Sequence, residues 1–207
     1  MSIRKAYTEW ATSYDSDRNL TRDLDQEVTR ATLGQLQYNT IIELGCGTGK
    51  NTPFFAQIGQ RVYATDFSEG MIAQAKAKLH LSNVLFTVAD LTQAWPYSDQ
   101  CADLIVCNLI LEHIADLGFI FTEGRRVLAD GGRFFISELH PFKQYVGKKA
   151  TFQRGDQQTE IPAFVHHISA FLEAAEQAGF TLKRLREWWH ETDEPTLPRL
   201  VTFMFHK

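Results

Sequence analysis

The fold is decided by eight residues that read Glu43-Leu44-Gly45-Cys46-Gly47-Thr48-Gly49-Lys50. They continue a short apolar run, residues 40–44, whose β-branched side chains predict a buried strand. Glycines at alternate positions let a backbone turn sharply and approach a ligand without interference from Cβ atoms. A helix that begins after such a turn presents its first amide groups to the ligand. The stretch therefore predicts a strand, a ligand-binding turn and a helix, in that order.

Two common glycine loops do not fit this stretch. The dinucleotide fingerprint G-x-G-x-x-G/A requires a small residue at its sixth position, where this chain has Lys50. The phosphate-binding loop G-x-x-x-x-G-K-[ST] requires a glycine at position 44 and a hydroxyl residue at position 51, where Leu44 and Asn51 stand. A dinucleotide oxidoreductase and a P-loop enzyme are therefore disfavoured.

Outward from the loop, strands and helices alternate. Further strands are expected at 61–65, 84–88, 102–107 and 133–137, and a final pair at 180–188 and 200–205. Helices are expected at 17–37, 51–58, 68–79, 116–129 and 168–178. This alternation predicts βαβ crossovers and a parallel sheet that is covered on both faces.

Several local signals define the ends and faces of these helices. Ser68 is expected to cap the helix that follows it, Gly131-Gly132 to stop the helix at 116–129, and Gly179 to end the helix at 168–178. The helix at 17–37 is expected to bury an apolar face made by Leu20, Leu24, Val28, Ala31 and Leu36.

Composition narrows the class of protein. The chain has 207 residues, a net charge of -4 and no basic stripe, so one domain is favoured and a nucleic-acid partner is not expected. Its three cysteines, Cys46, Cys101 and Cys107, have spacings that suggest neither disulfides nor zinc. Polar N-terminal residues and the lack of a long apolar run predict a cytoplasmic protein that does not bind membranes.

The glycine loop resembles motif I of the class I S-adenosylmethionine-dependent methyltransferases, an acidic residue followed by G-x-G-x-G. Other segments resemble the same family in the correct order. Residues 66–71, which read DFSEGM, resemble its D-x-S-x-x-M motif, and 89–91 and 107–110 stand where the family's chain passes the adenine and the methionine moiety. Near the N-terminus, Y-x-x-W-A-x-x-Y-D at 7–15 resembles the closing segment of the small-molecule branch, the type 11/25-like methyltransferases.

The resemblance implies an α/β fold: a doubly wound, mostly parallel seven-stranded sheet in three α/β/α layers, with an antiparallel C-terminal strand. It divides a single domain into an N-terminal helical cap (1–38), a cofactor-binding core (39–140), a substrate-covering insertion (141–167) and a C-terminal helix and strand pair (168–207).

The resemblance also implies S-adenosylmethionine as cofactor and S-adenosylhomocysteine as product. Asp66 would accept hydrogen bonds from the ribose hydroxyls, Asp90 would read the adenine, and Tyr14 would contact the carboxylate or methyl region. The cofactor residues expected from the resemblance are Tyr14, Glu43, Gly45, Gly47, Gly49, Asp66, Phe67, Met71, Asp90, Leu91, Asn108 and Leu109. Purely structural roles stay open for two of these residues, because Asp90 could cap the next turn and Met71 could pack without touching a ligand.

Methyl transfer from a sulfonium is an in-line displacement, so the protein needs a base only for an acceptor that still carries its proton. His140 and His167 are the leading candidates for that role, ahead of His166 and His113, although each could simply be a hydrogen-bonded histidine. Aromatic residues that could wall an acceptor pocket are Phe142, Tyr145, Phe152, Phe164, Trp188 and Trp189.

The residues after the fourth strand exclude several classes of methyl acceptor. Enzymes that methylate planar amines resemble [DNS]-P-P-[YFW] there, and metal-dependent catechol-type enzymes need an acid, whereas this chain has Cys107-Asn108. No Pro-Cys pair exists for cytosine C5 chemistry. The expectation is methyl transfer to a small organic molecule at oxygen, nitrogen or carbon, without a metal, by a monomer or homodimer. The alternatives are a non-catalytic cofactor-binding or regulatory protein, or an RNA or protein methyltransferase.

Overall fold

The computed structural model describes residues 3–16, 19–147, 151–154, 157–160, 163–193 and 197–207, with backbone alone at 151–154 and 157–160. Its main sheet has seven strands in the order β3-β2-β1-β4-β5-β9-β8. The strands are β1 (Tyr38–Leu44), β2 (Gly59–Asp66), β3 (Val84–Val88), β4 (Ala102–Asn108), β5 (Leu128–Leu139), β8 (Thr181–Trp188) and β9 (Leu200–His206). The first five are parallel, and β9 runs antiparallel to β5 and β8. The expected mostly parallel, seven-stranded sheet is confirmed.

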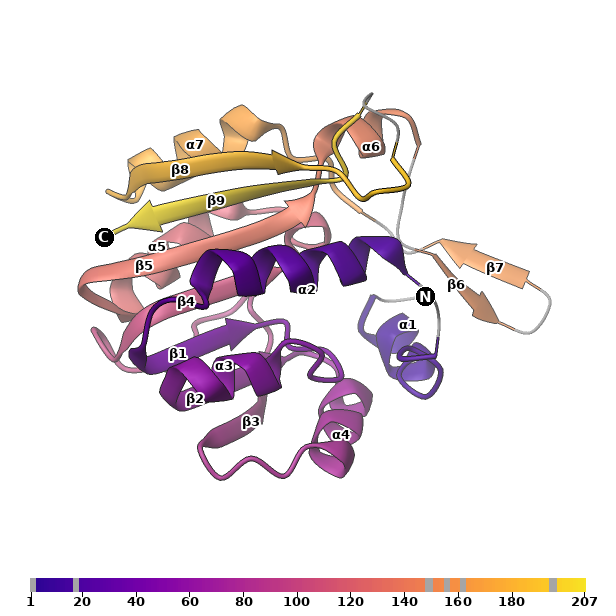
Figure 1. Cartoon of the computed structure of the whole chain (residues 1–207), viewed down its shortest axis with the longest axis horizontal. Helices are drawn as coiled ribbons and strands as arrows, with labels where there is room; N and C mark the ends of the chain where they lie inside the picture. The colour runs from indigo at the N-terminus through magenta and orange to yellow at the C-terminus, as the bar shows by residue number, and fades with distance from the viewer. Residues whose placement is uncertain (1–2, 17–18, 148–150, 155–156, 161–162, 194–196) are drawn as a thin grey trace.

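Helices cover both faces of this sheet (Figure 1). They are α1 (Ile3–Trp10), α2 (Leu20–Leu33), α3 (Thr52–Ile58), α4 (Glu69–Lys78), α5 (Leu117–Val127), α6 (Pro141–Tyr145) and α7 (Ile168–Gln177), with a 3₁₀ turn η1 (Leu111–His113). On one face, Phe121 of α5 and Phe171 of α7 pack in the larger core cluster. On the other, Leu33 of α2 and Phe55 of α3 pack against β1 and β2. The three-layer α/β/α arrangement is the one expected.

Two elements differ from the sequence-based expectation. Helix α2 ends at Leu33, so Leu36 lies beyond it and is 39% exposed, and Ala31 is exposed too. Leu33 takes their place in the core, where it is fully buried. Helix α5 ends at Val127, before the glycine pair expected to stop it, because the chain enters β5 at Leu128. Gly131, with φ +77°, lies inside β5, beside a shift of its register with β4.

The segment expected as an insertion begins with α6 and continues into a two-stranded antiparallel sheet, β6 (Thr151–Arg154) and β7 (Gln157–Glu160). Figure 1 shows this hairpin projecting beyond the main sheet. Among the described residues no helix is both long and apolar enough to cross a bilayer.

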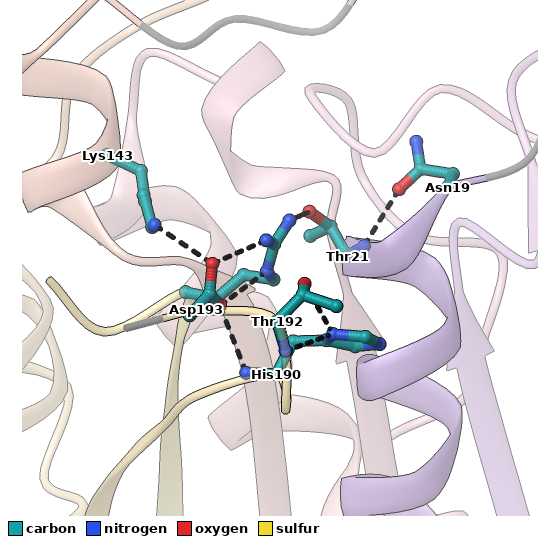
Figure 2. A network of polar contacts seen from close by, with 7 residues as sticks. Asn19, Thr21, Lys143, His190, Thr192 and Asp193 are labelled. Atoms are coloured by element: carbon teal, nitrogen blue, oxygen red, sulfur yellow. Dashed lines mark hydrogen bonds and ion pairs between the residues drawn. The ribbon is translucent and has the colours of Figure 1, made fainter. Parts of the chain in front are cut away.

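A polar cluster joins the C-terminal loop to the start of α2 (Figure 2). Arg199 donates from Nε and Nη2 to the two carboxylate oxygens of Asp193, at 2.7 and 2.5 Å. Its Nη1 also donates to Thr21 Oγ1 on α2, at 3.3 Å. Lys143 of α6 lies 3.3 Å from Asp193 Oδ1. We call Thr21, Lys143, Asp193 and Arg199 the clasp, because they connect three elements far apart in the sequence.

Candidate active site

A cavity of about 450 Å³ lies at the carboxyl ends of β1, β2 and β4. Because parallel strands end at one edge, residues distant in sequence meet there, which is the usual place for a ligand in an open α/β sheet. Eleven of the twelve residues expected to contact the cofactor line this cavity: Tyr14, Glu43, Gly45, Gly47, Asp66, Phe67, Met71, Asp90, Leu91, Asn108 and Leu109. Gly49 does not.

The glycine loop turns at the end of β1 through left-handed backbone conformations. Gly45, Gly47 and Gly49 have φ of +71°, +55° and +84°, which favour glycine. A Cβ on Gly45 would lie 2.3 Å from Ile110 Cγ2, so its hydrogen side chain allows the loop to approach the segment after β4. A Cβ on Gly49 would lie 2.5 Å from Leu79 Cδ1. Gly49 therefore permits packing against the end of α4 instead of lining the cavity.

Asp66 ends β2 and holds the loop in place. Its Oδ2 accepts from Gly47 N at 2.9 Å and its Oδ1 from Ser68 N at 2.8 Å. The side chain of Ser68 in turn caps α4 by accepting from Met71 N, as the sequence predicted. Burial raises the pKa of Asp66 to about 6, although its bonds to backbone amides oppose that shift.

Glu43 is the buried acid at the end of β1. Its Oε2 accepts from Thr52 Oγ1 at 2.7 Å, and burial raises its pKa to about 8. At neutral pH this carboxyl is therefore mostly protonated, and only 4% of the residue is exposed.

Asp90 follows β3 and organises the next turn, the alternative that the sequence left open. Its Oδ1 accepts from both the backbone nitrogen and the hydroxyl of Thr92, at 3.0 and 2.7 Å. Its Oδ2 lies 3.3 Å from Arg4 of α1. Because Asp90 and Thr92 both line the cavity, capping the turn and facing a ligand are compatible roles.

Aromatic side chains of the N-terminal segment cover the cavity. Tyr7, Trp10 and Tyr14 form one cluster, and the Tyr7 ring also meets Phe67 edge-on at 5.9 Å between centroids. The Arg22 guanidinium lies 4.0 Å from the centre of the Tyr14 ring. Tyr7 and Tyr14 line the cavity whereas Trp10 is in the small core beneath them.

One part of the cavity wall is a buried polar group that joins α2 to Asn51 and to the end of β4. Asp25 accepts from Asn108 Nδ2 on one carboxylate oxygen, at 2.7 Å, and from Asn51 Nδ2 on the other, at 3.0 Å. Asn108 Nδ2 also lies 2.9 Å from Thr29 Oγ1. Burial raises the pKa of Asp25, and hydrogen bonds from Ser137, Asn108 and Asn51 oppose the rise.

The four candidate histidines occupy very different places, and only His113 lines the cavity. Its Nε2 lies 2.7 Å from the Tyr7 hydroxyl. His140 is fully buried and caps α6, with Nδ1 accepting from Phe142 N and Nε2 bonded to Glu187. Burial lowers its pKa while Glu187 raises it, with a net decrease.

The other two histidines are engaged outside the cavity wall. His167 is exposed and bonds to the Tyr145 hydroxyl, and His166 donates to Ile114 O at 2.7 Å. The structure therefore does not bring His140 and His167, the leading candidates from the sequence, to the cavity.

The aromatic residues of the insertion do not form the cavity wall in the described part of the chain. Phe142, Tyr145, Phe164 and Trp189 are between 43% and 52% exposed, and Trp188 bonds to Thr202. The side chain of Phe152 lies outside the described residues.

Several residues of the wall belong to no motif that predicts a cofactor contact, above all Arg22, Asp25 and Asn51. The sequence does carry one signal for Asp25. It is a charged residue beside Leu24 on the apolar side of an amphipathic helix, where charged side chains are rare unless they have a polar partner or a functional role. Among the described residues no group of three or more His, Cys, Asp or Glu side chains converges as a metal site would require.

A family model and curated relatives of this chain both point to methyltransferases. Residues 42–136 match the family model of a methyltransferase domain. The malonyl-[acyl-carrier protein] O-methyltransferase of Yersinia pestis is 32% identical over 139 residues, 67% of this chain and 50% of that protein. The biotin biosynthesis bifunctional protein BioHC of Cellvibrio japonicus is 27% identical over 202 residues, 91% of this chain and 39% of that protein. The chain thus spans half or less of the length of these two relatives.

Two solved structures share the fold. The N-methyltransferase NodS of Bradyrhizobium japonicum in complex with S-adenosyl-L-homocysteine superposes with a TM-score of 0.73, at 15% identity, over 100% of this chain and 99% of that one. An S-adenosylmethionine-dependent methyltransferase from Mesorhizobium loti gives a TM-score of 0.74, at 20% identity, over 87% and 96%. The domain match and the curated relatives thus identify residues 42–136 of this chain as a methyltransferase domain of the class I S-adenosylmethionine-dependent family.

Proposed function

We propose that the protein transfers the methyl group of S-adenosylmethionine to a small organic acceptor by in-line displacement. The observation that carries this proposal is the cavity at the carboxyl edge of the sheet, whose wall contains the glycine loop, Asp66 and Asp90 together. The cofactor supplies an activated methyl group on its sulfonium, and the protein has to hold it and align the acceptor. The names of the curated O-methyltransferase relatives support an acceptor outside nucleic acids.

The cavity wall fits the adenosine end of this cofactor. The carboxylate oxygens of Asp66 can also accept hydrogen bonds from ribose hydroxyls, as carboxylates do in other doubly wound nucleoside sites. Phe67, Met71 and Leu91 supply apolar surface for the adenine, and a Cβ on Gly47 would meet no atom within 4 Å, so the loop leaves space beside it.

For the acceptor we assign Tyr7 and His113 in place of His140 and His167. The Tyr7 hydroxyl and His113 Nε2 form a hydrogen-bonded pair at the cavity, beside the apolar side chains of Ile110 and Ile114. Such a pair can hold a polar acceptor group between apolar walls. Where that group carries a proton, His113 can take it as the methyl group arrives.

The alternatives predict different observations. A non-catalytic cofactor-binding protein would bind the nucleosides without ever forming S-adenosylhomocysteine from S-adenosylmethionine. An RNA methyltransferase would need a basic surface, which a net charge of -4 does not favour. A cytoplasmic monomer or homodimer remains our expectation.

Calorimetric titration of the purified protein tests the cofactor site. We expect S-adenosylmethionine and S-adenosylhomocysteine to bind with micromolar affinity, and NAD not to bind. Asp66→Ala should weaken both nucleosides at least tenfold, because it removes the acceptor for the ribose hydroxyls and releases the loop amide of Gly47.

Asp103→Ala is the matched control. The Asp103 carboxylate also accepts from two backbone amides, those of Asn39 and Thr40 at 2.7 and 2.8 Å, but it does not line the cavity. Its loss should leave the affinities unchanged. Absence of binding by the wild-type protein, or an equal loss in both variants, would overturn the proposed site.

A further inference from the structure

Two short segments of the insertion leave a cluster of large apolar side chains exposed. Among the residues that the structure describes, ten such side chains are exposed, and five of them lie at 142–146 and 164–165. These five are between 43% and 60% exposed, and they are Phe142, Tyr145, Val146, Phe164 and Val165. Apolar surface gathered in this way on a globular protein usually marks a place where another molecule binds. We call these five residues the insertion patch.

Contacts within the fold hold the two segments side by side. The hydroxyl of Tyr145 and Nδ1 of His167 form a hydrogen bond, and their rings are 5.7 Å apart between centroids. Gln144 Nε2 donates to Glu112 Oε2 at 3.3 Å, and Phe164 N donates to Glu112 O at 2.6 Å. Both segments are thus bound to the same residue, and the insertion patch is one surface instead of two separate groups.

The insertion patch begins where the acceptor side of the cavity ends. Glu112, which binds both of its segments, directly precedes His113 in the 3₁₀ turn η1, and His113 lines the cavity. Ile114 also lines the cavity, and its carbonyl oxygen lies 2.7 Å from Nε2 of His166, two residues beyond Phe164. A molecule that leaves the cavity past His113 and Ile114 therefore has the insertion patch beside it.

The volume of the cavity leaves little room for an acceptor beside the cofactor. The cavity of about 450 Å³ lies in the lower part of the range, roughly 300–1,000 Å³, in which proteins bind one drug-sized ligand. S-adenosylmethionine is itself a ligand of that size. An acceptor that is larger than its reacting group therefore has to extend out of the cavity, where apolar parts of it need a surface that shields them from water.

We propose that the acceptor is amphipathic: its polar group lies at Tyr7 and His113, and its hydrocarbon or aromatic tail lies on the insertion patch. This inference rests on the proposed function, and it narrows the small organic acceptor to molecules with an extended apolar tail. A second copy of this chain fits the patch less well, because a stable dimer needs about 20–30 residues on each side, whereas the patch has five.

Calorimetric titration of the wild-type protein, saturated with S-adenosylhomocysteine, tests the tail. The probes are two series, alkyl 4-hydroxybenzoates from methyl to octyl and linear carboxylates from butyrate to dodecanoate, all kept below micelle-forming concentrations. A fully buried methylene group strengthens binding about fourfold, and a surface patch covers only one side of a tail. In at least one series, lengthening the tail by four methylene groups should therefore tighten binding at least tenfold. Affinities that do not depend on tail length, or no binding in either series, would overturn the inference.

Phe142→Ser and Phe164→Ser each remove apolar surface from one segment of the patch, and neither residue lines the cavity. Each should weaken the longest probe at least fivefold and leave the affinity for S-adenosylhomocysteine within twofold. Leu85→Ser is the matched control, because Leu85 is 56% exposed but lies on β3, which three strands separate from β5. It should leave all affinities within twofold. Equal losses in the control and in both patch variants would mean non-specific binding and would overturn the inference.

The other possible occupants of the patch give different results. A wild-type dimer that Phe142→Ser or Phe164→Ser converts to a monomer in sedimentation velocity would assign the patch to a second copy. Co-sedimentation with vesicles of phosphatidylglycerol and phosphatidylcholine that either variant abolishes would assign it to a lipid surface. Either result would overturn the inference. Failure of the wild-type protein to bind S-adenosylhomocysteine would instead reject the proposed function, so the two failures are distinguishable.

Discussion

At the scale of single residues, glycines with similar backbone conformations serve different purposes. Gly45 and Gly131 have φ of +71° and +77°, so both occupy the left-handed region. A Cβ on Gly45 would meet Ile110 at 2.3 Å, whereas a Cβ on Gly131 would meet nothing within 4 Å. Both positions thus require an unusual backbone, but only Gly45 also requires the absence of a side chain.

Comparing alanine at these two glycines separates the two requirements. Each substitution should lower the free energy of unfolding by about 1 kcal/mol, because an L-residue is strained at positive φ. Gly45→Ala should lower it further and weaken S-adenosylhomocysteine, because the methyl group forces Ile110 or the loop to move. Urea denaturation and calorimetric titration measure the two effects. Equal stability losses with unchanged binding in both variants would contradict this account.

The sequence predicts those site residues whose role depends on local spacing. The glycine loop, Asp66 and Asp90 were found because each follows a recognisable strand within its own motif. By contrast, the Tyr7–His113 bond joins residues 106 positions apart. Which histidine reaches the cavity depends on how α1 folds over the sheet, and no local pattern encodes that. The position of His140 directly after β5 suggests a place at the carboxyl edge of the sheet, but its ring caps α6.

At the scale of elements, Glu138 fastens the end of β5 to the segment after β4. Its Oε1 accepts from the backbone nitrogens of Ile110 and Leu111, at 3.0 and 2.9 Å. The side chain is buried, and burial raises its pKa to about 8 from an ordinary 4.5. A carboxyl whose pKa is higher in the folded state keeps its proton there, so its ionisation opposes folding as the pH rises.

This shift predicts how stability depends on pH. Between pH 4.5 and 8 the folded state binds a proton at Glu138 that the unfolded state has lost, so the unfolding free energy falls by about 1.4 kcal/mol per pH unit from this group. Glu138→Gln keeps an oxygen acceptor and removes the titration, so its curve should be flatter by about that slope. Urea denaturation at pH 5.5, 6.5 and 7.5 measures it, and parallel curves for both proteins would refute the assignment.

The type of each helix and strand is predictable because hydrophobic periodicity is a local property of the sequence. The C-terminal ends of α2 and α5 are not. The apolar pattern predicts that α2 continues past Leu36, but the chain leaves the helix at Gly34 to reach β1. The glycine pair Gly131-Gly132 predicts the end of α5, but both glycines lie inside β5. In both cases the position of a neighbouring strand, which depends on the whole sheet, decides where the helix ends.

At the scale of the whole molecule, the N-terminal segment and α2 both contribute to the cavity wall, and each is anchored to a different part of the fold. The N-terminal segment is tied to the half that carries the glycine loop: Asp15 accepts from Thr48 Oγ1 at 2.6 Å and pairs with Lys78 at 2.5 Å. On the other side, Leu24 and Val28 of α2 pack against Leu200 of β9. The clasp adds a polar connection from the C-terminal loop to the first turn of α2, the helix that carries Arg22 and Asp25 (Figure 2).

The clasp should therefore contribute measurably to global stability. Asp193 is nearly buried between Arg199 and Lys143, and although burial opposes it, the hydrogen bonds from Arg199 and the backbone of His190 lower its pKa to about 2. Relative to an ordinary 3.8, this shift corresponds to about 2 kcal/mol of folding stability at neutral pH. Asp193→Asn should lower the unfolding free energy by roughly that amount at pH 7.

The pH dependence of this loss identifies its cause. A carboxylate with a lowered pKa stabilises the fold above its unfolded pKa and ceases to do so as the pH falls through its folded pKa, so the difference between wild type and Asp193→Asn should shrink to about half near pH 3. Asp99→Asn is the control, because Asp99 also pairs with an arginine, Arg126 at 2.8 Å, but is 74% exposed. Its loss should cost less than about 1 kcal/mol. Equal losses in the two variants would show that the clasp contributes no more than an ordinary surface pair, and that the apolar contacts of α2, those of Leu24, Val28 and Leu33, hold it over the cavity.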